Sequence, residues 1–286
     1  MSAGTVTPGT GTGTGTGPRF VSRAAGRGRV TFVRVLNAEW IKLRSLRSTF
    51  WVLVAAVFLV IALGVLVCIG TVNRWPNTSA AEKARLSAPN ASLTGLYLAQ
   101  LAIGVLGVLV VTGEYATGSI RATIAAVPHR LPVLWAKTAV FGVVTFVLML
   151  GACLVAFLSG QAVLAKENID VSLGDPGVPR VVVGVAVYLA VTGILAIGIG
   201  AIVRNAAGGI AIVFGLLLVL PEVVRALPSD WQSRITKYLP SEAGQALTRW
   251  HPKGDELSPG AGITVFVLYA AVTLAVAAVL LRRRDA

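Results

Sequence analysis

Six stretches of the chain are almost entirely apolar, and polar connections separate them. Five are long enough to cross a bilayer, for which about 18 apolar residues are needed, and the fifth in order is shorter. The predicted spans are 51–71, 95–112, 138–160, 182–202, 208–220 and 262–280. Pro221 follows the short run, so this span either continues through residues 222–227 or is a broken, partly re-entrant element. The pattern predicts an all-α integral membrane protein with six transmembrane helices.

The composition supports this class and adds an orientation. Hydrophobic residues make up 55% of the 286 residues and charged residues only 13%, too few to cover the surface of a soluble domain. One side of the predicted membrane carries 15 Lys and Arg with three acids, and the other carries ten with nine acids. Because Lys and Arg are enriched in cytoplasmic loops, both termini are expected in the cytoplasm of a multi-pass plasma-membrane protein. These charges flank spans, so the net charge of +13 does not call for a nucleic-acid partner.

Two segments precede the first span. Residues 1–31 include a run of alternating Gly and Thr that cannot bury a core, so they are expected to form a disordered cytoplasmic tail, and residues 32–286 the membrane domain. Residues 32–49 are predicted to form an amphipathic helix at the inner leaflet. Its apolar face consists of Val33, Leu36, Trp40 and Leu43. Its basic residues, which would attract anionic membrane lipids, are Lys42, Arg44 and Arg47. The alternative is that these cations only set the topology.

The predicted spans contain no Asp, Glu, Lys, Arg or His. Ion-coupled carriers usually need such groups within the membrane, so a secondary transporter is disfavoured. The polar side chains that remain include Gln100, Thr145 and Thr192, which suit a pathway for an apolar or amphipathic substrate. The segment 221–259 is long for a connector, and it is expected to cap the outer mouth or to re-enter the membrane.

The sequence gives little support for a catalytic site or a metal site. His251 lies near Asp255 and Ser258, but closeness in sequence does not define a catalytic triad. Two His and two Cys, the latter both inside apolar runs, do not form a persuasive metal cluster. We therefore predict no catalytic residues and no metal site.

The stretch between spans two and three, residues 113–137, is the only sizeable cytoplasmic loop between spans on this topology. It is expected to hold a short helix that Thr117 or Ser119 caps and that Pro128 ends, and Lys137 is expected to begin span three with its stem snorkelling to the interface. Such a helix can dock onto a partner protein. The alternative is a loop that only sets topology.

This loop is similar to the coupling-helix region of ABC type-2 transporter permeases, which carry a Glu, then a Gly-Ser or Gly-Thr pair, then a helix that ends at a Pro and a basic residue. The corresponding residues, with one further cation on the helix, are Glu114, Gly118, Ser119, Arg121, Pro128 and Arg130. The segment "NAEWIKLRSLRSTFW" also resembles the cytoplasmic connecting helix of bacterial permeases of this type.

The resemblance implies a non-enzymatic transport subunit that works with a separate cytoplasmic ABC ATPase, on which ATP and Mg would bind. Such permeases form homo- or heterodimers and carry lipids, polysaccharides, drugs or peptide antibiotics, and the charge-free spans favour export of an amphipathic or apolar cargo. The alternatives are a non-transporting membrane scaffold or regulatory anchor and, less favoured, an ion-coupled secondary transporter.

Overall fold

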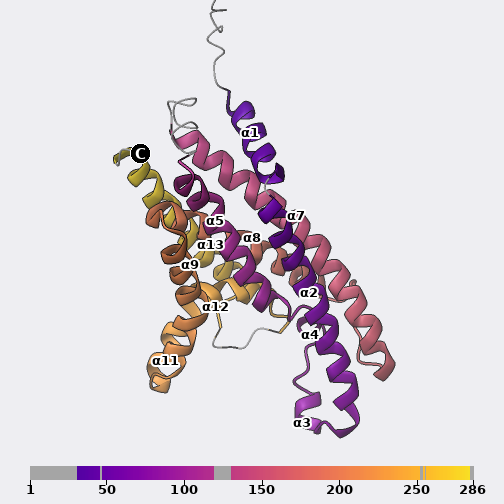
Figure 1. The fold of residues 1–286 in the computed structure, drawn as a ribbon. Helices are drawn as coiled ribbons and strands as arrows, with labels where there is room; N and C mark the ends of the chain where they lie inside the picture. Colours follow the sequence, from indigo (N-terminus) through magenta and orange to yellow (C-terminus); the bar gives the residue numbers. More distant parts are fainter. Residues whose placement is uncertain (1–30, 46, 119–129, 252–253, 255, 284–286) are drawn as a thin grey trace, which may run out of the picture. The chain divides into compact units, whose positions relative to one another are not determined.

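The computed structural model describes residues 31–45, 47–118, 130–251, 254 and 256–283. The expected disordered tail therefore lies, except for Thr31, outside the described residues. The described part of the chain is helical and has no strand (Figure 1). The elements are α1 (Phe32–Ser45), α2 (Arg47–Arg74), η1 (Trp75–Asn77), α3 (Ala80–Lys83), α4 (Ala88–Ser92), α5 (Leu96–Ala116), α7 (Arg130–Leu164), η2 (Ala165–Glu167), α8 (Val178–Val203), α9 (Ala206–Phe214), η3 (Gly215–Val219), α10 (Leu220–Arg225), α11 (Ser229–Ile235), η4 (Thr236–Tyr238), α12 (Pro240–Gln245), η5 (Ala246–Thr248) and α13 (Pro259–Arg283).

The six predicted spans are confirmed as six helices long and apolar enough to cross a membrane. They correspond to α2, α5, α7, α8, the continuous α9–α10 segment, and α13. Most begin or end several residues beyond the apolar runs, because polar residues at a helix end still complete backbone hydrogen bonds. The predicted helix over 32–49 is shorter than expected, since α1 ends at Ser45 and α2 begins at Arg47.

The fifth span is continuous rather than interrupted. The helix begins after Asn205, whose side chain accepts a hydrogen bond from the Gly208 N–H at 2.9 Å, and runs through α9 and α10 to Arg225. Just before Pro221 the backbone widens into the π-helical turn η3. Proline lacks an N–H and its ring crowds the preceding turn, and a π-turn is one way in which a helix accommodates this. The span therefore reaches its length by passing through the proline.

α8 is the central helix of the described spans. It packs against α5, α7, α9 and α13. In its most apolar window 78% of the residues are buried, compared with 28% in α2 and 22% in α13. α2 and α13 therefore present most of their apolar side chains to the surroundings, as expected for helices that face lipid.

The segment between α10 and α13 folds into short helices, and one of them is buried. α12 packs against α13 and α8, and Gly244 lies against the rings of Tyr188 and Phe266. Arg225 and Arg249 both pair with Glu242 of α12, which ties α12 to α10 and to the chain after η5. The expectation that this segment re-enters or caps the spans stays a prediction, but its helices do pack against the spans.

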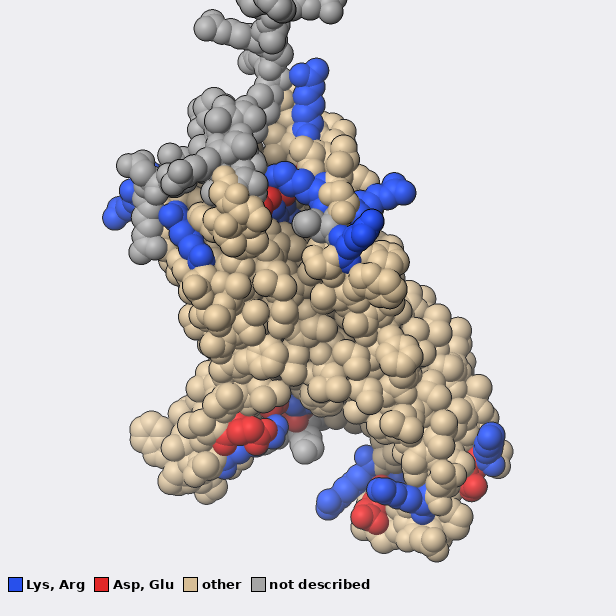
Figure 2. Space-filling model, in the orientation of Figure 1, with Lys and Arg blue, Asp and Glu red and all other residues tan. Residues whose placement is uncertain are grey.

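The helix ends separate by charge. Figure 1 draws α1 and the C-terminal end of α13 at one end of the spans, and α3 and α11 at the other. On the face drawn in Figure 2, Lys and Arg gather at the α1 end with few acidic atoms, whereas the opposite end shows both signs. We refer to these as the basic end and the mixed end.

Candidate functional site

The candidate site is built where α1 packs on α7. Val35 and Glu39 are one helical turn apart and are the two buried residues of α1, exposed by 6% and 4%. Val35 joins Val133 and Ala136 of α7 in a small apolar cluster, which holds α1 against that helix. This contact brings the Glu39 carboxylate beside the first two turns of α7, where Lys137 lies.

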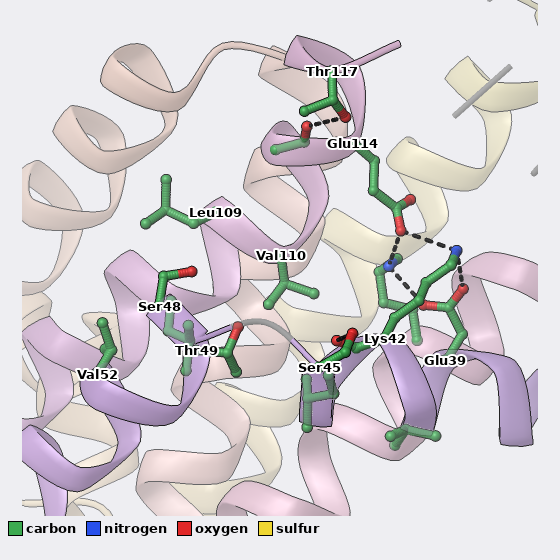
Figure 3. A pocket seen from close by; sticks show the side chains of 15 residues that line it. Glu39, Lys42, Ser45, Ser48, Thr49, Val52, Leu109, Val110, Glu114 and Thr117 are labelled. Carbon is green, nitrogen blue, oxygen red and sulfur yellow. Dashed lines mark hydrogen bonds and ion pairs between the residues drawn. The ribbon is translucent and has the colours of Figure 1, made fainter. Parts of the chain in front are cut away.

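Four charged side chains meet at this point, and we call them the charge network: Glu39 and Lys42 of α1, Glu114 of α5 and Lys137 of α7 (Figure 3). Lys137 Nζ donates to Glu39 Oε2 at 2.7 Å and to Glu114 Oε1 at 2.9 Å. Lys42 Nζ donates to Glu39 Oε1 at 2.8 Å and to Glu114 Oε1 at 3.2 Å. Each ammonium bridges both carboxylates, so the network is neutral and joins three helices.

The network corrects two expectations. Lys137 does not begin a span with its stem snorkelling outward, because α7 begins at Arg130 and the Lys137 side chain is only 7% exposed. The spans are also not free of charge, since Glu114 lies in α5 and Lys137 in α7. Burying these groups is feasible because the opposite charges neutralise each other and most of their polar atoms are hydrogen-bonded.

The electrostatics of α1 follow from this pairing. Burial of the Glu39 carboxylate is the largest single effect and raises its pKa, but attraction and hydrogen bonds from Lys137 and Lys42 together hold the pKa below its ordinary value. Partial burial acts to lower the pKa of Lys42, and the hydrogen bonds and charges of Glu39 and Glu114 outweigh it, so this pKa is raised. Both α1 groups are therefore held in their charged forms.

This pairing predicts how stability depends on pH. A lowered carboxyl pKa stabilises the folded state above the ordinary value of 4.5, and the contribution disappears as pH falls through the lower folded value. A raised Lys42 pKa stabilises below the ordinary 10.5 and is lost as pH rises above it. We expect the melting temperature of the purified protein to stay level between about pH 6 and 9 and to fall below pH 4.5.

A matched pair of variants tests whether Glu39 causes the fall in melting temperature in acid. Glu39→Gln should lower the melting temperature at neutral pH and reduce the further fall in acid, whereas Glu222→Gln, which changes an exposed carboxylate of α10, should leave the acid profile unchanged. An identical acid profile in wild type and Glu39→Gln would show that the stability lost in acid comes from other groups.

The other predicted coupling residues are only partly described. Gly118 follows the end of α5 with φ of +69°, in the left-handed region that favours glycine. Thr117 is the C-cap of α5, and its hydroxyl donates to the Gly113 carbonyl at 2.9 Å. The predicted short helix lies outside the described residues, and so do these predicted site positions: Ser119, Arg121, Pro128 and the side chain of Arg130.

The predicted interfacial residues separate into two groups. Lys42 belongs to the charge network, whereas Arg44 and Arg47 are exposed and Trp40 is 47% exposed. The side of α1 that faces the protein is therefore the Val35–Glu39 side rather than the side of Val33 and Trp40. A lipid-facing role for the exposed side stays a prediction.

The three predicted pathway residues are packed within this chain. Tyr188 Oη donates to Gln100 Oε1, Thr192 donates to the Tyr188 carbonyl at 2.9 Å, and Thr145 is fully buried. Thr145 Oγ1 has no hydrogen-bond partner within the described ranges. Their role in a pathway remains a prediction.

Sequence reasoning missed Glu39. The apolar face alone predicts the helix, yet Glu39 is the only acidic residue among the first 50 and lies four residues after Val35. A single carboxylate in a strongly basic segment was the available signal. That signal does not identify the ion-pair partner of Glu39, because Lys137 lies 98 residues further along the chain.

Six membrane-length helices with a charge network at one end define a multi-pass helical membrane protein, and this network fastens α1 to two of the spans. The chain belongs to the ABC-2 transporter family, since the sequence model described as ABC-2 family transporter protein matches residues 35–221, more than half of the chain. The matched range contains all four members of the charge network. A comparison with curated proteins found no match. The chain is thus a permease of an ABC transporter.

Proposed function

We propose that this permease exports an amphipathic or apolar substrate, and that a separate cytoplasmic ATPase docks on the segment between α5 and α7. The observation that carries the proposal is the charge network. Glu114 and Lys137 stand close to the two ends of that segment, and both are bonded to α1. A force applied to the segment would therefore move α1, α5 and α7 together instead of bending one helix end.

The distribution of charge supports the orientation and the cargo class. The excess of Lys and Arg at the basic end favours placing that end in the cytoplasm (Figure 2). Among the described residues of the spans, Asp, Glu, Lys and Arg occur only near helix ends. An apolar middle offers no site for a bare ion, so the driving force is expected to come from ATP and Mg on the partner.

The coupling role can be tested directly at Gly118, the second residue after the end of α5. Gly118→Ala places a Cβ at φ of +69°, which costs an L-residue about 1–2 kcal/mol, while no atom of the described residues lies within 4 Å of that Cβ. We expect the melting temperature to fall by no more than a few degrees, and ATP-driven export in proteoliposomes to fall roughly fivefold because the strained backbone after α5 weakens docking.

Gly113→Ala is the matched control. A Cβ there also meets nothing within 4 Å, but Gly113 lies inside α5 without a positive φ, so export should be unchanged. Equal export by both variants would argue against a docking role for the segment. The ATPase for the assay is obtained by affinity purification of the permease in detergent. If no ATPase co-purifies in repeated experiments, a membrane scaffold is favoured instead.

A further inference from the structure

A cavity of 470 Å³ opens beside the charge network, between α1, α2, α5 and α7. Most of its wall is apolar, and Val52, Leu109, Val110 and Val140 are among the lining side chains. The charge network forms one side of it, and hydroxyl groups of α2 line the wall next to these charges (Figure 3). The cavity is therefore amphipathic, with its polar part at the basic end.

Two hydroxyl groups in this cavity make no hydrogen bond within the described part of the chain. Ser48 and Thr49, in the first turn of α2, lie across from Leu109 and Val110 (Figure 3). Thr49 is only 3% exposed, yet neither hydroxyl makes a hydrogen bond to any residue that the structure describes. Buried hydroxyls are normally satisfied, so the Thr49 hydroxyl points to an acceptor that a ligand would supply, and the exposed Ser48 hydroxyl next to it can donate to the same acceptor.

The charge around the cavity selects the kind of acceptor. The charge network is neutral within itself, but its Lys42 side chain is 38% exposed and lines the cavity. Arg44 and Arg47 are exposed on the neighbouring turns of α1 and α2. The charged residues that line the cavity sum to zero, so the two exposed arginines next to them in the chain supply the positive charge that favours an anionic group with several acceptor oxygens.

We propose that this cavity binds an anionic phospholipid from the leaflet at the basic end. Phosphate oxygens of the headgroup accept hydrogen bonds from Ser48 and Thr49 and lie beside Lys42, and an acyl chain follows Val52, Leu109 and Val110. The proposal requires only that the chain spans a membrane, and it does not depend on an ATPase or on a transported cargo.

Native mass spectrometry of the purified full-length protein tests the site. The protein is incubated in detergent with phosphatidylglycerol or phosphatidylcholine of the same acyl chains, without any ATPase. We expect phosphatidylglycerol to be retained preferentially. The double variant Ser48→Ala, Thr49→Val should weaken its retention roughly tenfold, since two hydrogen bonds are lost and the side-chain volumes barely change. Thr264→Val removes an exposed hydroxyl of α13 and should have no effect.

A variant that fills the cavity gives an independent test of the lipid site. Val110→Trp places an indole in the cavity and should abolish lipid retention, whereas Val143→Trp on α7, at a position that is 63% exposed, should leave it intact. If Val110→Trp does not fold, the near-isosteric double variant still decides the question.

Four outcomes would overturn the proposal. Full retention by a folded Val110→Trp protein would place the lipid elsewhere. Equal retention of the two lipids, or no loss in the hydroxyl variant, would remove the headgroup assignment. Competition by soluble glycerol phosphate as strong as that by the lipid would show that the apolar wall contributes nothing. None of these results bears on the Gly118 export test, so the two proposals can fail separately.

Discussion

Replacing Lys137 with methionine is expected to destabilise the protein by about 3–5 kcal/mol and to abolish ATP-driven transport. The Lys137 ammonium is 7% exposed and donates to both Glu39 and Glu114. Methionine fills a similar volume but removes the ammonium that lies between the two carboxylates, and among the described residues Lys42 then remains to balance them. Because removing one member of a buried ion pair leaves an uncompensated charge, the expected loss far exceeds that of a surface pair.

The measurement is the melting temperature in detergent together with export in proteoliposomes. Lys166→Met is the matched control, since Lys166 is exposed beyond the other end of the same helix. A double-mutant cycle with Glu39→Gln should give a coupling energy of about 0.5–3 kcal/mol, because the second change removes one of the stranded carboxylates. Additive effects, or a Lys137→Met protein as stable as the Lys166→Met protein, would mean that the network does not hold the helices together.

The second large effect is expected at Gly262, where α13 meets α12. A Cβ at this position would stand 2.4 Å from the Ala243 carbonyl oxygen and 2.6 Å from the Ala246 Cβ. The first of these atoms is backbone and cannot rotate away, so Gly262→Ala must push α12 off α13. Such overpacking typically costs about 1–3 kcal/mol, and the displaced α12 should also lower transport, since it lies against Tyr188 and Phe266 through Gly244.

Gly260→Ala is the control for this change, because Gly260 lies two residues before Gly262 in the first turn of α13 and its Cβ would meet no atom of the described residues within 4 Å. Its melting temperature should match the wild type or rise slightly, since alanine favours a helix more than glycine does. If Gly262→Ala and Gly260→Ala behave alike in melting temperature and transport, the close contact between α12 and α13 is not important for either.

These contacts place mechanical connections at both ends of the spans. At the basic end the charge network joins α1, α5 and α7, and at the mixed end α12 packs on α13 and α8. α8 packs against α5, α7 and α13, so it touches helices held at either end. A rigid central helix of this kind can transmit a displacement from one end to the other, because close-packed interiors do not deform continuously.

The six spans, the Lys and Arg asymmetry and the resemblance to ABC type-2 permeases were all readable in the sequence alone, because hydropathy and charge are properties of short segments and need no knowledge of neighbours. Glu114 was identified in the same way, from its place in a local motif.

Only the tertiary structure decided how the charged residues pair and where the helices end. Glu39 and Lys137 are 98 residues apart, and their ion pair exists because Val35 seats α1 on α7. The continuation of the fifth span through Pro221 likewise depends on a π-turn that no residue pattern specified. Periodicity within one helix determines which residues share a face, but which other helix that face meets depends on packing between segments distant in the chain.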